Sequence, residues 1–158
     1  MPKISALLHT HNDALRLGRA LDSLRPCDEV LVIDQASEDE TEKVAREHGA
    51  TFKTAIPGVT SGAYAMDAAN EWILCLRCNE ALSDELEAAL IEWKEAEPEE
   101  TMACYSVPIR AENDSGWEKQ SPEVRLVNRK RMNWVGDMPP EQTCSAMLSG
   151  DILSFREP

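Results

Sequence analysis

The sequence predicts an α/β protein, a Rossmann-like three-layer α/β/α sandwich with a mostly parallel sheet. Apolar runs that can form strands alternate, through the first half of the chain, with helical segments of about a dozen residues. The strands are continuously apolar, as in EVLVID at residues 29–34, which indicates helices on both faces of the sheet. Beyond Pro98, short strand-like pieces follow one another without helices, so mixed or antiparallel strands are expected to extend the same sheet.

The expected elements follow from apolar runs, capping residues and helix breakers. Strands are expected at residues 3–9, 29–34, 50–53 and 71–76, and in the second half at 102–109, 123–128 and 132–136. The first helix is expected after Asn12 and the second after Ser37, because both side chains can accept a hydrogen bond at a helix N-cap. A third helix is expected over residues 61–70, and a fourth from Ser83 onward, where apolar residues recur at helical spacing.

Length and composition favour one globular domain. The chain has 158 residues, of which 42% are hydrophobic and 28% are charged. We expect residues 1–158 to form a single domain, with an alternating strand–helix half at 1–97 and a mixed extension at 98–158. The net charge of −13 repels nucleic acid and anionic membranes, so no nucleic-acid partner is expected.

The N-terminal sequence and the cysteine content predict a cytoplasmic protein. The opening stretch, MPKISALLHTHND, has a short apolar run but no small-residue cleavage site, so it is interpreted as a strand of the mature fold. No segment reaches the roughly 18 apolar residues that a membrane-spanning helix needs. The five cysteines are an odd number, and with no signal peptide they predict free thiols in a reducing compartment.

Polar side chains gather where three of the expected parallel strands end. They follow the first, second and fourth strands, at residues 9–13, 34–39 and 77–80. Because ligands of open parallel sheets bind at the carboxyl ends of the strands, these stretches are expected to line one crevice. None of them contains a G-x-G-x-x-G fingerprint or a P-loop, which disfavours dinucleotides or ATP bound in those ways.

Two of these stretches, with the spacing between them, resemble the family 2 glycosyltransferases, inverting enzymes with the nucleotide-sugar-binding A-type fold. That family opens with a strand, a T-x-N-E-like turn and a helix ending in S-L, and this chain has LLHTHNDALRLGRALDSL. The family's second strand ends V-V-D-x-x-S-x-D-x-T, and here it is LVIDQASEDET. The similarity is close from Ile4 to about Gly49 and continues through EWILCLRCNEALSDEL. The later EVRLVNRKRMNWVGDMPPE is similar to a segment of bacterial members that act on lipopolysaccharide core sugars.

The resemblance implies that residues 1–97 bind a nucleotide sugar, with UDP as a candidate nucleotide, and that the acceptor is an envelope glycan or a lipid-linked sugar. The nucleotide-binding residues that it implies are Thr10, His11, Asn12, Asp13, Asp34, Ser37, Asp39 and Arg77. The Asp34 carboxylate can accept a hydrogen bond from a uracil imide or a ribose hydroxyl, and His11 can stack on the base. Taken singly, Asn12 and Ser37 could equally serve only as helix caps.

The resemblance fails at the family's metal-binding motif. Where the family has D-x-D, this chain has Arg77, Cys78 and Asn79, followed by the retained Glu80. Mg²⁺ and Mn²⁺ prefer several hard oxygen ligands, so Asn79 and Glu80 would make only a weak site for either cofactor. Arg77 could instead contact the pyrophosphate directly as a bidentate cation, or it could simply point to solvent.

Three functions fit these residues. The first is an active transferase, in which Glu141, at the position of the family's H-E motif, or Asp137 is the general base for the acceptor hydroxyl. The second is a catalytically inactive homologue that serves as a nucleotide-binding or partner-binding module. The third is a zinc site, whose candidate ligands are His9, His11, Asp34 and Cys78.

Two further expectations concern the second half of the chain. The sequence stops at Pro158, where family enzymes continue through helices beside the acceptor, and this predicts an uncovered apolar surface and a homodimer formed by residues from about Met102 onward. Arg125 and the basic run at 129–131 are interpreted as charges that protect an exposed strand edge.

Overall fold

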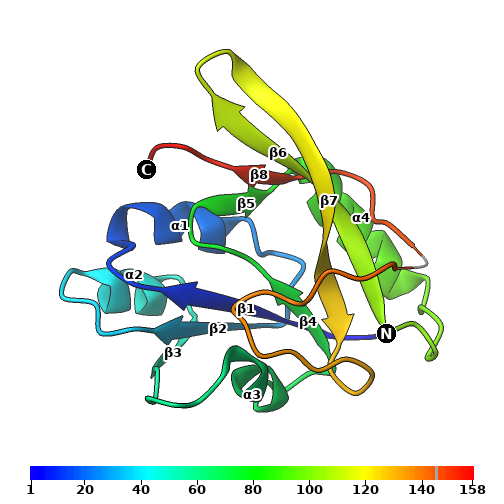
Figure 1. Ribbon diagram of the computed structural model, residues 1–158, viewed down its shortest axis with the longest axis horizontal. Coiled ribbons are helices and arrows are strands. Elements are labelled where there is room, and N and C mark those ends of the chain that lie inside the picture. The colour runs from blue at the N-terminus through cyan, green and yellow to red at the C-terminus, as the bar shows by residue number, and fades with distance from the viewer. Residues whose placement is uncertain (145) are drawn as a thin grey trace.

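The computed structural model describes residues 1–144 and 146–158, and its centre is one eight-stranded sheet in the order β3-β2-β1-β4-β7-β6-β8-β5 (Figure 1). The strands are β1 (Ile4–Thr10), β2 (Glu29–Asp34), β3 (Thr51–Thr54), β4 (Trp72–Cys75), β5 (Glu80–Leu82), β6 (Cys104–Asn113), β7 (Gly116–Asn128) and β8 (Ile152–Ser154). The helices are α1 (Ala14–Asp22), α2 (Thr41–Glu47), α3 (Ser61–Met66) and α4 (Asp84–Glu95).

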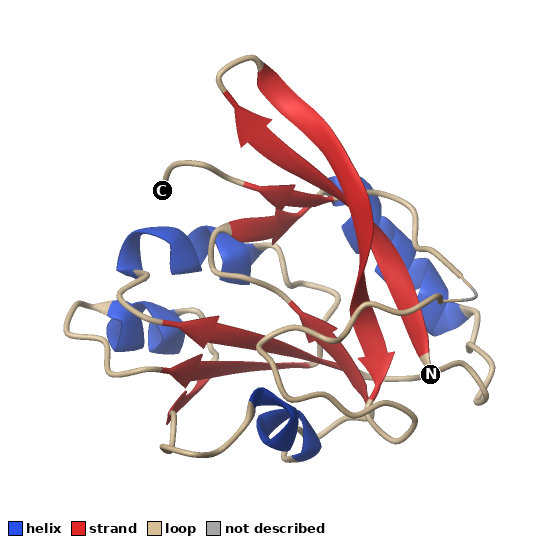
Figure 2. Ribbon diagram, viewed as in Figure 1, coloured by secondary structure: helices blue, strands red, loops and turns tan. Residues whose placement is uncertain are grey.

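The sheet is parallel over its first four strands and mixed over the rest. Residues 5–10 of β1 pair in parallel with residues 29–34 of β2, and β4 and β3 add in parallel on either side. The strand β7 pairs antiparallel with both β4 and β6, whereas β8 runs parallel to β6 and antiparallel to β5. Figure 2 shows the β6–β7 hairpin extending beyond the rest of the sheet. The predicted α/β fold, with a mostly parallel sheet and mixed C-terminal strands, is confirmed.

Each face of the sheet has its own buried core, because neighbouring residues of a strand point to opposite faces. Leu8 of β1 packs with apolar side chains of α1, α2 and α4, including Leu17, Ala45 and Leu90. Leu7 packs on the other face, with side chains of α3 and of the loop after β7. The continuously apolar strands predicted this covering on both faces.

The helix starts differ from the predictions at both predicted capping positions. The helix α4 begins after Ser83, where a helix was expected, and the Ser83 hydroxyl caps it by accepting a hydrogen bond from the Leu86 N–H at 3.2 Å. The N-cap of α1 is Asp13 rather than Asn12, and neither α1 nor α2 has a side-chain cap. Ser37 lies well before α2, which begins at Thr41. Both predicted caps bond to a neighbouring loop instead, as the next subsection describes.

Three predictions about the second half of the chain are wrong. Residues 132–136 form a loop rather than a strand, and its Trp134 carbonyl oxygen lies so close to Gly62 of α3 that an added Cβ would be 1.8 Å away. Arg125 is fully buried in β7 and so protects no exposed edge. Cys104 and Cys144 form a disulfide, so only three cysteines are free thiols: Cys27, Cys75 and Cys78.

None of the helices within residues 1–144 and 146–158 combines the length and the apolar character that a bilayer crossing requires.

Candidate functional site

The candidate site lies where the parallel strands β1, β2 and β4 end. Thr10, the last residue of β1, pairs directly with Asp34, the last residue of β2. Since β4 is parallel to β1 on its other side, the loop that begins at Leu76 emerges at the same edge. The predicted crevice residues are thus gathered at the edge where ligands of open α/β sheets bind.

Hydrogen bonds fasten the loops after β1 and β2 to each other. The buried Asp34 carboxylate accepts the Ser37 N–H at 3.0 Å and also the Ser37 hydroxyl hydrogen. The Ser37 oxygen accepts the Asn12 N–H at 2.8 Å, and the Asn12 side-chain oxygen accepts the Glu38 N–H at 2.8 Å. Asn12 takes a left-handed conformation with φ of 53°, which asparagine tolerates better than most residues. Asp34, Ser37 and Asn12 therefore join the two loops into one rim at the strand ends, although none of the three lines the cavity described below.

The next residues of the two loops continue this network. Asp13 accepts hydrogen bonds from the Thr10 hydroxyl at 3.1 Å and from the His11 N–H at 2.9 Å. Asp39 accepts the Ala14 N–H at 3.2 Å and bonds to both the N–H and the hydroxyl of Thr41, and this hydroxyl bond lowers the pKa of the Asp39 carboxyl. The exposed His11 ring bonds through Nδ1 to the Gln35 carbonyl. The predicted nucleotide-binding residues of both loops thus lie together.

A cavity of about 480 Å³ opens beside this rim, at the end of β4. It is lined by His9, Asp13, Arg16, Leu76, Arg77, Cys78, Asn79, Asp137 and Met138. The turn that replaces the family's D-x-D motif therefore faces a cavity together with Asp13 of the first loop. Asp137 joins them from the loop after β7, and its carboxylate accepts the Ser61 hydroxyl hydrogen at 2.9 Å.

Sequence reasoning missed Arg16, and it considered His9 only as a zinc ligand. Both ring nitrogens of His9 are buried and without a hydrogen-bond partner. Burial lowers the pKa of this imidazole from its ordinary value of 6.5, against the opposing effect of the Asp137 charge. Buried polar groups are nearly always hydrogen-bonded, so this imidazole is a group that a ligand in the cavity could contact.

Glu80, which follows the turn, is buried and forms an ion pair with Arg125. It is 2% exposed, and its two carboxylate oxygens accept hydrogen bonds from Arg125 at 2.7 Å each. One of these oxygens also accepts a hydrogen bond from the backbone N–H of Arg77 at 2.7 Å. Burial alone would lower the pKa of the Arg125 guanidinium, but the hydrogen bonds that it donates to Glu80, together with the charge of Glu80, more than offset this effect and raise the pKa. Glu80 thus neutralises a buried cation.

The residues of this turn do not fit the divalent metal that the family implies. The predicted ligand Glu80 is engaged by Arg125, and the Asn79 amide nitrogen is turned toward Ser154 and Phe155, at 3.5 Å. A hard cation such as Mg²⁺ needs carboxylate and carbonyl oxygens that are free to coordinate it. The weak metal site predicted at Asn79 and Glu80 therefore has no free carboxylate.

The zinc alternative is wrong. The Cys78 thiol donates to the His9 carbonyl oxygen at 3.3 Å, and burial raises the pKa of this thiol to about 12. Across residues 1–144 and 146–158, no three His, Cys, Asp or Glu side chains come together in a way that could hold a metal ion.

The two candidate general bases are placed differently. Asp137 is exposed and lines the cavity, whereas Glu141, also exposed, is not among the cavity-lining residues.

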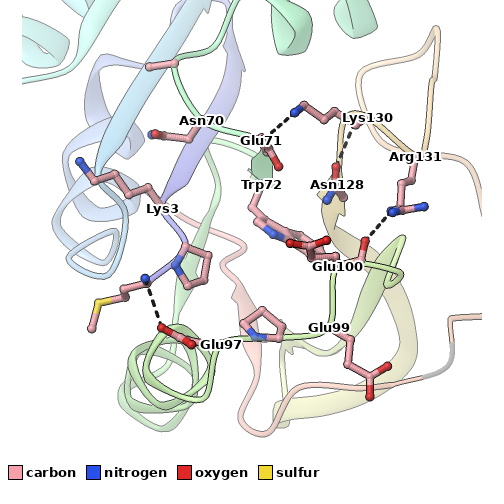
Figure 3. A pocket seen from close by; sticks show the side chains of 14 residues that line it. Lys3, Asn70, Glu71, Trp72, Glu97, Glu99, Glu100, Asn128, Lys130 and Arg131 are labelled. Carbon is pink, nitrogen blue, oxygen red and sulfur yellow. Dashed lines mark hydrogen bonds and ion pairs between the residues drawn. The ribbon is translucent and has the colours of Figure 1, made fainter.

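A larger cavity, of about 790 Å³, lies at the opposite edge of the sheet, where β1 and β4 begin (Figure 3). Its charged groups largely satisfy one another. Lys130 pairs with Glu71 at 2.6 Å, the terminal amine lies 3.6 Å from Glu97, and Arg131 donates to the Glu100 carbonyl. We therefore place the functional site at the carboxyl ends of the strands.

Sequence comparison finds relatives that match nearly the whole of this chain. It is 38% identical over 161 residues to an uncharacterized glycosyltransferase of Rickettsia felis, a match that covers 96% of this chain and 57% of the relative. It is 36% identical over 159 residues to another from Rickettsia conorii, covering 95% of this chain and 56% of that protein. The chain thus spans little more than half the length of these curated relatives. No protein-family model matches it.

Among solved structures, the fold is similar to that of glucosyl-3-phosphoglycerate synthase from Mycobacterium tuberculosis, in a complex with Mn²⁺, UDP and glucosyl-3-phosphoglycerate. The TM-score is 0.53 at 17% identity, over 69% of this chain and 44% of that enzyme. The fold and its strand-end cleft, with these relatives, define a glycosyltransferase-like protein of the A-type fold. The resemblance to glycosyltransferases seen in the sequence motifs is thereby confirmed, and the assignment to family 2 stays a prediction.

Proposed function

We propose that this chain binds a nucleotide sugar in the cleft at the ends of β1, β2 and β4, as the donor-binding part of a sugar-transferring protein. The relatives named as glycosyltransferases support the class of activity. The mycobacterial enzyme of similar fold, solved with UDP, makes UDP the first nucleotide to test. Because the chain spans little more than half of its relatives, the transfer reaction is proposed for the whole protein.

The observation that carries this proposal is the network that joins Asp34, Ser37 and Asn12. It fixes two loops at one strand edge in the absence of any local helix cap. Each oxygen of the Asp34 carboxylate already accepts from Ser37, and each has a second lone pair for a uracil imide or a ribose hydroxyl. A site held rigid in this way loses little entropy when it binds a ligand.

Asp137 is the general base that we favour for the acceptor hydroxyl. It lines the cavity beside Arg77 and Asn79 and is exposed enough for an acceptor to reach. Its hydrogen bond from Ser61 orients one carboxylate oxygen and leaves the other free to take a proton. Glu141 remains the second candidate. Asp137→Asn should abolish sugar transfer in the full-length protein while leaving UDP affinity within about twofold, because amide and carboxylate have nearly the same shape.

A thermal-shift panel of nucleotides and nucleotide sugars tests donor binding. Wild-type protein should be stabilised by a nucleoside diphosphate, and Asp34→Ala should lose that stabilisation. Asp34→Asn, which keeps an acceptor for Ser37, separates ligand recognition from loop integrity. Asp67→Ala removes an exposed carboxylate just beyond α3 and is the matched control. If no nucleotide stabilises the wild type, or if Asp34→Ala responds as the wild type does, the cleft is not the donor site.

The inactive homologue remains a second candidate, and the Glu80–Arg125 ion pair is the observation that favours it. The residue that the family uses beside its metal is here committed to a buried arginine. Hydrolysis of a nucleotide sugar by the full-length protein, measured with and without Mn²⁺, separates the two candidates. An inactive binding module would bind the donor without consuming it under either condition.

The acceptor class, the homodimer and the cytoplasmic location are also proposals. An envelope glycan or lipid-linked acceptor follows from the sequence resemblance. Three exposed large hydrophobic side chains in the second half of the chain, Trp117, Val135 and Met147, support self-association there. Sedimentation at high concentration tests the dimer. Fractionation of cells tests the location, because disulfides such as Cys104–Cys144 are rare in reducing compartments.

A further inference from the structure

Arg16 faces the strand-end cavity of a strongly acidic protein. It lies in the first turn of α1, half-buried, and its side chain lines the strand-end cavity. Across residues 1–144 and 146–158, that side chain takes part in no hydrogen bond or ion pair. The chain has 29 acidic residues, so an arginine left unpaired while facing a cavity indicates a site for an anionic ligand.

Arg77 faces the same cavity and is only loosely engaged. Its guanidinium lies 3.6 Å from Glu80 and 3.5 Å from Glu123, and it is 48% exposed. Both carboxylates are bonded more closely by Arg125, at 2.7 and 3.2 Å. Exposed ion pairs of this kind hold a side chain weakly, so Arg77 is free to turn toward a ligand.

Each carboxylate in the cavity accepts hydrogen bonds from the protein through one of its oxygens. Asp13 accepts hydrogen bonds from Thr10 and His11, and Asp137 accepts one from Ser61. The cationic donors that line this cavity are the guanidiniums of Arg16 and Arg77, each of which presents N–H groups in a fork that matches phosphate oxygens.

We propose that Arg16 and Arg77 together bind the diphosphate of the nucleotide, in the place of a divalent metal. This inference rests on the proposed donor site and names the groups that hold its charge. It also accounts for a turn whose oxygen ligands do not fit a metal, because the carboxylate of Glu80 is consumed by Arg125. Two guanidiniums carry the same total charge as one Mn²⁺ or Mg²⁺, and arginine keeps that charge at every physiological pH.

The pair would act on the leaving group during transfer. When the bond between the anomeric carbon and the β-phosphate oxygen breaks, its electron pair stays on that oxygen, which gains negative charge. The acceptor oxygen forms the new bond to the anomeric carbon, and its proton passes to the general base. Guanidiniums fixed beside the diphosphate stabilise the charge that develops there.

Calorimetric titrations in EDTA, at fixed ionic strength, test the pair with inorganic pyrophosphate, UDP and uridine as separate probes. Arg16→Gln and Arg77→Gln keep much of the length of the side chain and remove its charge. Arg46→Gln is the matched control, because Arg46 lies outside the cavity on α2, pairs with Glu42, and changes the net charge equally. Circular dichroism and melting temperature establish that each variant is folded.

We expect each cavity variant to weaken pyrophosphate and UDP by roughly tenfold to a hundredfold and to leave uridine unchanged. Arg46→Gln should bind all three probes as the wild type does. Wild-type affinity in Arg16→Gln, or wild-type protein that fails to bind pyrophosphate in EDTA, would overturn the inference. If UDP binds only in the presence of Mn²⁺, the donor site is supported and the proposal that the two arginines replace the metal is refuted. If pyrophosphate binds through Arg16 while neither UDP nor uridine binds, the arginine pair is supported as a diphosphate site and the proposal of a nucleotide-sugar site is refuted.

Discussion

Removing Arg125 should destabilise the protein severely, because it would leave Glu80 as a buried charge without its cation. The two side chains are 0% and 2% exposed and share two hydrogen bonds of 2.7 Å. In Arg125→Met, the Glu80 carboxylate keeps the backbone N–H of Arg77 and a loose ion pair with the half-exposed Arg77 guanidinium at 3.6 Å. The loss of the buried partner costs about 3–5 kcal/mol. For a chain of this size that corresponds to a fall of about 6–20 °C in melting temperature.

Urea denaturation followed by tryptophan fluorescence measures this cost. The double variant Glu80→Gln with Arg125→Met should recover much of the lost stability, since neither charge then remains buried. The control is Arg46→Met, which breaks the exposed Arg46–Glu42 pair at 3.0 Å and should cost no more than about 0.5 kcal/mol. If Arg125→Met cost under about 1 kcal/mol, Glu80 would not need Arg125, and its assignment as a structural carboxylate would be refuted.

Three further predictions concern single residues. His9 has a pKa lowered by burial, so the unfolded chain binds the proton more readily, and stability should fall as pH drops below 6.5; His9→Leu should lessen this fall in chemical denaturation across pH 5–8. The three free thiols, each with a pKa raised by burial to about 12, should react slowly with a thiol reagent at pH 7, whereas reduction of the disulfide should add one faster-reacting thiol, at the half-buried Cys144, because Cys104 is itself buried. Gly62→Ala should destabilise the protein by about 1–3 kcal/mol, because the added Cβ would overlap the Trp134 carbonyl oxygen, and a melting curve like that of the wild type would refute this contact.

The central strands could be predicted from the sequence because their signal is local. Uninterrupted apolar runs define β1, β2 and β4, and the parallel register that follows brings the polar strand ends to one edge. The gathering of Asp34, Ser37 and Asn12 was predictable for the same reason. The two sequence motifs and the spacing between them further predicted that the chain is similar to glycosyltransferases.

The errors arose where distant residues decide the structure. Asn12 and Ser37 have the chemistry of helix caps, but each bonds to the other's loop, about 25 residues away. The segment around Trp134 has the composition of a strand, yet it packs as a loop on the glycine of α3. Cys104 and Cys144 are 40 residues apart, and neither length nor composition indicates which cysteines meet.

The sequence showed no sign of a role for Arg16 in the cavity, and it indicated His9 only as a strand-end residue and a candidate zinc ligand. Arg16 sits on an ordinary amphipathic helix, where an arginine usually means a solvated face. Among the described residues, neither the Arg16 side chain nor the ring nitrogens of His9 have a hydrogen-bond partner, and this can be recognised only once the neighbouring elements are in place. Arg125 was expected at the surface because it is a basic residue in a strand. It is instead buried as the counterion of Glu80, which lies 45 residues away in the sequence.

The central claim is that the cleft holds a nucleoside diphosphate without a metal ion, and titration of wild-type protein with UDP in EDTA and in Mn²⁺ tests it most directly. If a metal ion bridges protein and diphosphate, the metal raises the affinity for UDP by the same factor by which UDP raises the affinity for the metal. A bridging ion would therefore appear as a difference between the two titrations. We predict UDP affinities that agree within about twofold under the two conditions. An affinity at least tenfold higher in Mn²⁺ would contradict the account and would mean that residues outside the Arg77–Glu80 turn hold the ion.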